Sequence, residues 1–229
     1  MDTSDFQNNP MDQFEQWFLQ AQGKMPSGSL GLSERLEKKL SPLIRRVFSA
    51  VFPSMDRFEY NAVFLATANK EGVPSSRVVL LKGYDEKGFR FYTNYNSRKA
   101  KELDENPKAS LCFYWGLPPR QVRIEGDVEK LSYDESNKYW LSRPRGSRLS
   151  ALASEQSSPI SSREELDEEV KELEKKYEGQ EIPCPENWGG YLLKPHTYEF
   201  WQGMPSRNHI RLQYKKNQEG SWQKSWLQP

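Results

Sequence analysis

The apolar positions nearest the N-terminus recur at helical spacing. Asn9 followed by Pro10 supplies a helix cap and a residue suited to a first helical turn. The apolar residues that follow at intervals of three or four are Met11, Phe14, Trp17 and Phe18. We therefore predict a short amphipathic helix that ends near Gly23, preceded by disordered residues at 1–9.

A second helical pattern covers residues 33–52, beyond a flexible linker expected at 24–32. Its apolar residues are Leu36, Leu40, Leu43, Ile44, Val47, Phe48 and Val51. Pro42 is expected to kink or divide this helix. Two interpretations remain open: a basic amphipathic helix for a partner or a membrane surface, or, as the preferred one, a helix packed on the domain.

From Asn61 onward the pattern changes to short apolar or alternating runs that are typical of strands. Predicted strands cover 62–67, 78–81, 89–93, 109–115, 120–131, 190–193, 198–202, 210–214 and 221–227. Predicted helices cover 97–103, 134–141, 147–153 and a segment that begins at Ser162 with the capping box Ser162-x-x-Glu165. In this last helix the residues expected to form a buried stripe are Leu166, Val170, Leu173 and Tyr177.

Strand clusters on both sides of a helical segment predict a mainly β fold, a barrel with helices packed outside it. The length of 229 residues suits one domain with an extension. We expect an N-terminal helical extension and insertion at 1–60. The main domain then covers 61–229, with a helical insert at 134–178.

Composition narrows the function classes. The 33 basic and 32 acidic residues leave a net charge of +1, so nothing drives the whole chain toward nucleic acid or membrane. Two cysteines and two histidines build neither a disulfide framework nor a histidine-rich metal site. No apolar stretch reaches the ~20 residues of a membrane span. We expect a cytoplasmic protein without a metal.

The first candidate site lies between Arg77 and Lys99. The apolar run Val78, Val79, Leu80 and Leu81 has a cation at each end, Arg77 and Lys82. Further along, Asn96-Ser97 is a helix-capping signal followed at once by Arg98 and Lys99. Cations in a first helical turn oppose the helix dipole unless an anion is bound there. The stretch therefore predicts a phosphate site, with a solvated basic turn as the alternative.

A second cluster combines Tyr139, Arg143 and Ser147 around Pro144. Tyr139 and Arg143 are four residues apart and would share a helix face, while Ser147 would begin the next helix. A phenol, a guanidinium and a hydroxyl at a helix start are good phosphate donors. The alternative is a surface bend.

Two weaker clusters follow. Gln156 and Ser157 offer amide and hydroxyl donors, although a simple turn is the plainer interpretation. Arg207, His209 and Arg211 alternate, which would place all three on one face of a strand near Trp201. That face could stack on and neutralise an anionic ring, or be only an exposed basic edge.

Taken together, these segments resemble the pyridoxine (pyridoxamine) 5′-phosphate oxidase family. The resemblance covers about Asn61 to Tyr214 and is carried by RVVLLKGYDEKGFRFYTNYNSRKAKEL, FYW, RQVRIEGDVEKL, YWLSRPRGS, QSS, WGGY and EFWQG in this order. It implies the FMN-binding split-barrel fold and a homodimer with two FMN sites at the subunit interface.

The resemblance also assigns residues. FMN would be held by Arg77, Val78, Val79, Leu80, Leu81, Lys82, Tyr92, Thr93, Arg98, Lys99, Gln121, Gln156, Ser157, Trp201 and Arg211. The substrate phosphate would be bound by Lys82, Tyr139, Arg143 and Ser147. Arg207 and His209, with Asn208 between them, would cover the pyridine ring and act as the catalytic pair. The implied reaction oxidises pyridoxamine or pyridoxine 5′-phosphate to pyridoxal 5′-phosphate, with O₂ as acceptor and hydrogen peroxide as product.

The chain departs from the family pattern in four places. Asn208 and Ile210 replace a leucine and an aspartate, Trp226 stands where an arginine is usual, the N-terminal basic segment has no clear match, and 24–60 is a longer link. These departures leave two alternatives to an oxidase. One is a weakly active or non-catalytic relative that carries FMN or pyridoxal phosphate, and the other is a split-barrel flavoprotein with another substrate.

Overall fold

The structure, a computed structural model, describes residues 6–22, 59–116 and 118–229 of the chain. The linker expected at 24–32 and the helix expected at 33–52 lie outside the described residues. Within the described ranges there are five α-helices, one short 3-10 helix and nine strands. None of these helices is long and apolar enough to cross a membrane.

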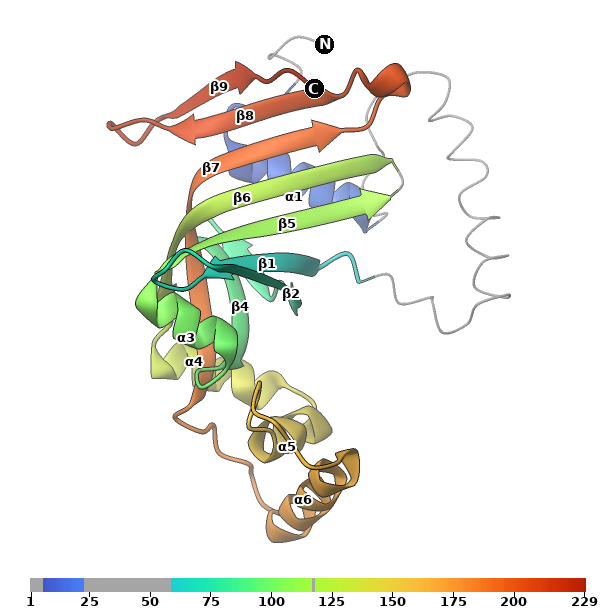
Figure 1. Cartoon of the computed structure of the whole chain (residues 1–229), viewed down its shortest axis with the longest axis vertical. Coiled ribbons are helices and arrows are strands. Elements are labelled where there is room, and N and C mark those ends of the chain that lie inside the picture. Colours follow the sequence, from blue (N-terminus) through green and yellow to red (C-terminus); the bar gives the residue numbers. More distant parts are fainter. Residues whose placement is uncertain (1–5, 23–58, 117) are drawn as a thin grey trace, which may run out of the picture. The chain divides into compact units, whose positions relative to one another are not determined.

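The elements are shown in Figure 1. The helices are α1 (Pro10–Ala21), α3 (Arg98–Glu105), α4 (Tyr133–Ser142), α5 (Arg145–Ala153), α6 (Arg163–Lys176) and the 3-10 helix η2 (Pro205–Arg207). The strands are β1 (Ala62–Ala68), β2 (Pro74–Leu80), β3 (Gly83–Asp85), β4 (Gly88–Asn94), β5 (Lys108–Gly116), β6 (Pro119–Lys130), β7 (Trp188–Gln202), β8 (Ile210–Lys216) and β9 (Trp222–Trp226).

The nine strands form one sheet in the order β2-β1-β5-β6-β7-β4-β3, with β8 pairing with β7 and β9. The resolved registers are antiparallel, as between Phe64 and Cys112 in β1 and β5 or Phe91 and Tyr191 in β4 and β7. Short turns join the early strands, and Gly72 has the positive φ of 79° that such a turn favours. The predicted antiparallel, mainly β architecture is therefore confirmed.

The described residues group into two compact units. The first combines those up to Ala62 with Phe113–Val122 and Glu199–Pro229, and the second combines Val63–Cys112 with Arg123–Tyr198. The helices α4, α5 and α6 fall in the region of the predicted helical insert. The domain boundary at residue 60 stays a prediction.

The first unit has an aromatic core built on α1. The helix begins as predicted, with the Asn9 side chain accepting a hydrogen bond from the Met11 amide. The ring of Phe14 lies 5.2 Å from that of Phe113, and the ring of Trp17 lies 5.3 Å from that of Phe200.

The prediction that all of residues 1–9 are disordered is wrong for the last four. Phe6 is buried, 6.3 Å from the ring of Trp17 and 5.8 Å from that of Trp226. Burying one aromatic ring against two others outweighs the conformational entropy lost by this short polar segment.

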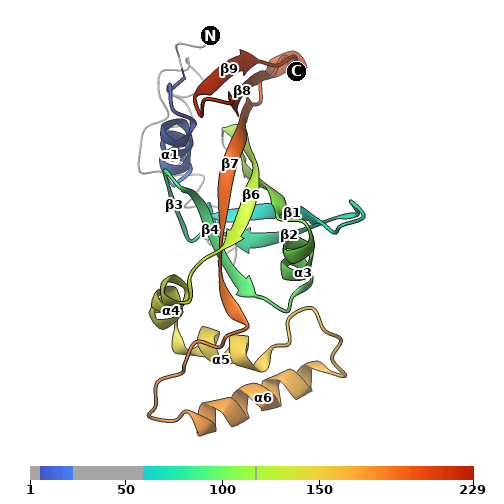
Figure 2. The same ribbon diagram turned by 90° about the vertical axis from the view of Figure 1, so that its left-hand side faces the viewer.

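The second unit contains most of the sheet and the helices α3 to α6. Its strands bury Phe89, Phe91, Tyr191 and Tyr198. Helices α5 and α6 lie side by side (Figures 1 and 2). A separate apolar cluster, made of Trp140, Leu149, Ile182, Cys184 and Trp188, packs beside them.

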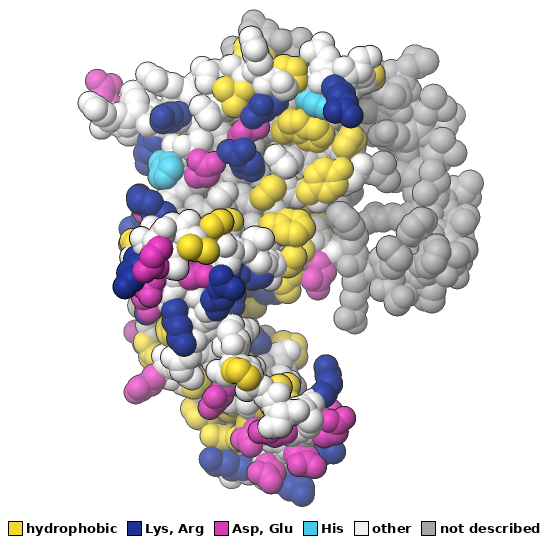
Figure 3. Space-filling view, in the orientation of Figure 1, with side chains coloured by type: hydrophobic (Ala, Val, Ile, Leu, Met, Phe, Trp, Pro, Cys, Tyr) yellow, Lys and Arg dark blue, Asp and Glu magenta, His cyan; other side chains and the backbone are white. Residues whose placement is uncertain are grey.

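Helix α6 has no fully buried residue, so its predicted apolar stripe is only half-buried. Val170, Leu173 and Tyr177 pack at the edge of the Trp140 cluster. Acidic and basic side chains cover the outside of this helical end of the second unit (Figure 3). The Ser162 hydroxyl caps α6, but Glu165 reaches the Ser161 amide instead of that of Ser162, so the predicted capping box is incomplete.

Two strand predictions need correction. Residues 190–193 and 198–202 form one continuous strand, β7, that includes Pro195. Residues 83–85 form a strand of their own, β3, paired with β4 around a turn at 86–87, where the sequence suggested a longer turn at 84–88.

Candidate functional site

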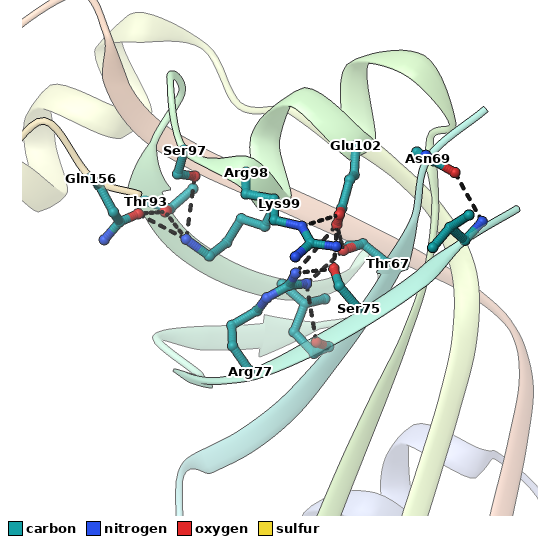
Figure 4. A network of polar contacts seen from close by, with 12 residues as sticks. Thr67, Asn69, Ser75, Arg77, Thr93, Ser97, Arg98, Lys99, Glu102 and Gln156 are labelled. Atoms are coloured by element: carbon teal, nitrogen blue, oxygen red, sulfur yellow. Dashed lines mark hydrogen bonds and ion pairs between the residues drawn. The ribbon is translucent and has the colours of Figure 1, made fainter. Parts of the chain in front are cut away.

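Lys99 is the centre of a polar cluster at the start of α3, in the second unit (Figure 4). Its Nζ donates hydrogen bonds to Thr93 Oγ1 at 3.0 Å, to Ser97 Oγ at 3.2 Å and to Gln156 Oε1 at 2.8 Å. Thr93 donates to the same Gln156 oxygen at 2.8 Å. The structure thus brings together three predicted site residues that come from β4, α3 and the loop after α5.

The Lys99 ammonium is buried without an anion. Its side chain is only 8% exposed, its three partners are neutral, and it forms no ion pair among the described residues. Burial, followed by repulsion from Arg77, lowers the pKa of Lys99 to about 8. A bound phosphate would supply the missing counter-charge, so the donor set fits a phosphate group.

Arg77 and Arg98 share one carboxylate, that of Glu102. Arg98 Nε lies 2.8 Å and Arg77 Nη2 3.2 Å from the Glu102 oxygens. Thr67 and Ser75 donate to the same carboxylate from β1 and β2. Figure 4 shows both guanidinium groups turned toward Glu102. The arginines are therefore oriented before any ligand binds.

Glu102, Thr67 and Ser75 were not among the predicted site residues. The spacing of four residues between Arg98 and Glu102 on one helix was the available signal. The hydroxyls of Thr67 and Ser75 reach Glu102 only because the strands bring them there, and no local pattern records that.

The predicted run from Arg77 to Lys82 follows β2 and its end. Val78 is 55% exposed, Leu81 is buried, and Lys82 is exposed with its amide bonded to the Arg90 carbonyl at 2.9 Å. Among the described residues, no hydrogen bond joins the Lys82 side chain to the Lys99 cluster. Its assignment to a ligand stays a prediction.

A cleft of about 370 Å³ opens beside α3. Its lining includes the predicted site residues Arg98 and Ser157, together with Asn96, Lys101 and Glu102. Ser157 has a positive φ of 77°, an uncommon conformation for a residue other than glycine. The cleft gives a polar ligand access to the N-terminus of α3, whose capping residue Ser97 makes no side-chain cap bond.

The side chains of Tyr139 and Arg143 each pack against an aromatic ring. The Tyr139 ring stacks on that of Tyr92 at 3.9 Å, and the Arg143 guanidinium lies 4.8 Å above the Trp188 ring. Burial raises the pKa of Tyr139, so its phenol stays protonated near neutral pH.

Helix α4 ends at Ser142, and Arg143 is its C-terminal cap residue with an extended backbone conformation. The prediction that Tyr139 and Arg143 share a face of one helix therefore fails at Arg143, which lies just outside the helix. Helix α5 begins at Arg145, two residues before the predicted start at Ser147, and Ser147 is exposed in its first turn.

In the first unit, Trp201 and His209 are neighbours. Their ring centroids are 4.8 Å apart, and the Met204 amide donates to His209 Nδ1 at 3.2 Å. Since Nδ1 accepts this bond, the neutral imidazole carries its proton on Nε2 and can donate it outward.

The prediction that Arg207, His209 and Arg211 share one strand face is wrong. Strand β8 begins at Ile210, and Arg207 lies in η2. Ser206 and Arg207 both have positive φ, 57° and 59°, which breaks the extended alternation. Arg207 and Asn208 are exposed at this turn.

Arg211 is held by Glu199 on β7. Its Nε donates to Glu199 at 2.9 Å and its Nη1 to the Gln228 carbonyl at 2.8 Å. The Glu199 hydrogen bond raises the pKa of Arg211. Although Ile210 replaces the carboxylate of the family pattern, Glu199 supplies one to this arginine. Gln121 is half-buried on β6.

Among the described residues, no group of three or more His, Cys, Asp or Glu side chains is placed to hold a metal ion. Both cysteines, Cys112 and Cys184, are free.

An antiparallel, mainly β sheet with packed helices is the architecture of a split-barrel protein. The family model described as pyridoxamine 5′-phosphate oxidase matches residues 54–177. The model of the pyridoxine 5′-phosphate oxidase C-terminal dimerisation region matches residues 188–229. The chain belongs to the pyridoxamine 5′-phosphate oxidase family.

Proteins of similar sequence align with most of this chain. A pyridoxine/pyridoxamine 5′-phosphate oxidase of Rubrobacter xylanophilus is 52% identical over 172 residues, which are 75% of this chain and 79% of that protein. One from Aliarcobacter butzleri is 43% identical over 100% of this chain and 93% of its own length. The chloroplastic oxidase 1 of Arabidopsis thaliana is 52% identical over 80% of this chain, which spans only 34% of that longer protein.

A similar solved structure is PhzG from Burkholderia lata 383 in complex with tetrahydrophenazine-1-carboxylic acid. It has a TM-score of 0.73 and 32% identity, and the match covers 90% of this chain and 100% of that one. A pyridoxamine 5′-phosphate oxidase-related, FMN binding protein from Nostoc punctiforme has a TM-score of 0.60 and 21% identity, with 88% and 100% coverage, and supports the fold alone.

Proposed function

We propose that this protein is an FMN-dependent oxidase that converts pyridoxamine 5′-phosphate or pyridoxine 5′-phosphate to pyridoxal 5′-phosphate, with O₂ as acceptor and hydrogen peroxide as product. One observation carries the proposal. In the second unit two separate cations, Lys99 and Arg143, have no ion-pair partner among the described residues. An oxidase of this class needs one phosphate site for its cofactor and another for its substrate.

The cluster around Lys99 is assigned to the FMN phosphate. Lys99 and Thr93 would donate to it directly, and Arg77 and Arg98 would do so while held by Glu102. The full FMN set is that expected from the family: Arg77, Val78, Val79, Leu80, Leu81, Lys82, Tyr92, Thr93, Arg98, Lys99, Gln121, Gln156, Ser157, Trp201 and Arg211. Bound FMN supplies the redox chemistry.

The cluster around Arg143 is assigned to the substrate phosphate. Arg143 would donate through its free Nη1, Tyr139 through its protonated phenol and Ser147 through its hydroxyl, with Lys82 completing the set. The aromatic stack under Arg143 fixes the plane of the guanidinium without a competing carboxylate. These residues bind and orient the substrate by its phosphate.

Arg207, Asn208 and His209 are assigned to the pyridine ring. The hydrogen bond from the Met204 amide leaves Nε2–H of His209 as the outward donor, so this residue orients a ring acceptor and does not remove a proton through Nδ1. Arg207 is exposed and strained at a left-handed position, which keeps its side chain available to a ligand.

The working unit is proposed to be a homodimer. The C-terminal region matches a dimerisation region, which supports self-association. In the second unit, Phe64, Val73 and Val78 of the β1–β2 hairpin are 52%, 53% and 55% exposed, an unusual apolar concentration for a free edge. Two free cysteines suit a reducing, cytoplasmic compartment.

The test is reconstitution followed by aerobic turnover. Purified protein is expected to bind FMN, become yellow, and form pyridoxal 5′-phosphate and peroxide from pyridoxamine 5′-phosphate. Colourless protein that FMN cannot reconstitute would contradict the proposal. Flavin binding without turnover of either substrate would instead support the non-catalytic carrier, whose basis is Ile210 and Trp226.

A further inference from the structure

The Nε atom of Arg148, a half-buried residue on α5, is a buried donor without a hydrogen-bond partner among the described residues. Four buried side-chain polar atoms of the described residues lack a hydrogen-bond partner: Gln22 Oε1, Arg143 Nη1, Arg148 Nε and Tyr191 Oη. Two of the four are arginine nitrogens only five positions apart in the chain. A buried donor without an acceptor is costly, so each such atom calls for an explanation.

The two guanidinium groups act on each other. Burial is the main cause that lowers the pKa of Arg143, Tyr139 and Cys184 oppose it, and the positive charge of Arg148 adds a smaller lowering effect. Neither arginine forms an ion pair with any described carboxylate. Like charges held together without an anion favour binding of an anion between them.

The neighbouring Arg145 has a different role. Its guanidinium donates to the carbonyl oxygens of Tyr177 and Gln180, at the end of α6. These hydrogen bonds join α5 to the end of α6, so the role of Arg145 is structural. The Nε atom of Arg148, three residues further along the same helix, has no such partner among the described residues.

The start of α5 adds further donors. Its capping residue is Pro144, with no side-chain cap bond, and its first turn contains no acidic residue. The first amides of the helix and the Ser147 hydroxyl therefore remain free to meet a negative charge. They lie in the stretch between Arg143 and Arg148.

We propose that Arg148 is a second phosphate-binding guanidinium of the substrate site, acting beside Arg143. This rests on the proposed function for the identity of the ligand, a 5′-phosphorylated pyridine, but not for the anion site itself. Two guanidinium groups match the two negative charges of a phosphate monoester at neutral pH. The pair therefore sets the preference for phosphorylated over unphosphorylated B6 compounds.

The experiment compares the FMN-loaded wild type with Arg148→Met and Arg148→Lys. Calorimetric titration measures the binding of pyridoxal 5′-phosphate and of pyridoxal, which lacks the phosphate. Arg148→Met is expected to bind pyridoxal 5′-phosphate about 10- to 100-fold more weakly, because a charge-assisted hydrogen bond is lost, with pyridoxal binding unchanged. Arg148→Lys, which keeps the charge, should restore part of the loss.

The matched control is Lys138→Met, which removes one positive charge from an exposed position on α4 beside Tyr139. It should bind both compounds as the wild type does. Equal weakening of pyridoxal and pyridoxal 5′-phosphate by Arg148→Met, or wild-type affinity for both, would overturn the proposal. If Arg148→Met fails to fold, Arg148→Gln is measured in its place with the same expectations.

A second probe separates this proposal from the oxidase function. Inorganic phosphate should raise the melting temperature of the wild type and of Lys138→Met, and raise that of Arg148→Met by a clearly smaller amount. If the protein shows no oxidase activity but this difference persists, the function is wrong and the anion site stands. If phosphate protects all three equally, Arg148 is not part of an anion site.

Discussion

Glu102→Gln removes the carboxylate that orients two arginines of the proposed FMN phosphate site. Its side chain is 7% exposed and accepts hydrogen bonds from Thr67, Ser75, Arg77 and Arg98. Burial alone would raise the pKa of Glu102, but these four donors lower it from 4.5 to about 2. At about 1.36 kcal/mol for each pH unit, this corresponds to about 3 kcal/mol of stability at pH 7.

We expect Glu102→Gln to lower the free energy of unfolding by about 2–4 kcal/mol at pH 7, since it leaves two guanidinium groups without their counter-charge. The contribution of Arg98 is the smaller one, because its side chain is 64% exposed and solvent screens the pair. Urea unfolding of the FMN-free protein, followed by tryptophan fluorescence, measures the difference.

The free energy of unfolding that Glu102 contributes should decrease as the pH falls. The folded pKa of Glu102 lies below its unfolded value, so its contribution is complete above about pH 4.5 and is lost as the pH falls toward 2. The gap between wild type and Glu102→Gln should therefore be constant from pH 7 to 5 and about half as large by pH 3. Glu105→Gln, an exposed change of the same charge at the end of α3, is the control. A gap that is independent of pH down to 3, or equal to that of the control, would show that the Glu102 carboxylate does not stabilise the fold through these bonds.

Three further predictions concern single residues. Lys99→Met should weaken FMN binding at least tenfold, as measured by flavin fluorescence quenching, yet leave the FMN-free protein as stable as the wild type or slightly more so, because burial already penalises this charge. In the wild type, FMN affinity should fall as the pH rises above about 8, where the unliganded Lys99 loses its proton. An unchanged FMN affinity for Lys99→Met would count against the phosphate assignment. Arg207→Ala should raise KM or lower kcat for pyridoxamine 5′-phosphate with FMN retention unchanged, and a loss of FMN instead would show that this turn serves the flavin. Asn9→Ala should lower the free energy of unfolding by about 1 kcal/mol, since it removes the 2.8 Å cap bond to the Met11 amide, and no change in urea unfolding would show that the cap is dispensable.

Local patterns predicted those parts of the fold that local physics determines. The cap and apolar spacing of α1 were sufficient because the helix buries one face. The alternation in β6 likewise separated the buried Val122 and Ile124 from their neighbours. Two separate strands were predicted at 190–193 and 198–202, but the structure has one long strand, β7, that accommodates Pro195.

The site was predicted less completely, because its geometry depends on contacts distant in sequence. Thr93, Lys99 and Gln156 were found individually, and only the fold shows that they meet. The alternation of Arg207, His209 and Arg211 misled because positive φ at Ser206 and Arg207 has no sequence signature outside glycine. Arg148 stood among three arginines of the RPRGSR segment, and only its unsatisfied burial distinguishes it from Arg145.

The proposed function requires that this chain bind FMN and use it to oxidise a 5′-phosphorylated B6 compound. The most direct measurement mixes the FMN-loaded protein with one equivalent of pyridoxamine 5′-phosphate in the absence of oxygen. We expect loss of the yellow flavin absorbance together with one pyridoxal 5′-phosphate formed per flavin, and return of the colour when oxygen is admitted. A flavin absorbance that persists, with no pyridoxal 5′-phosphate formed from pyridoxamine or pyridoxine 5′-phosphate, would contradict it.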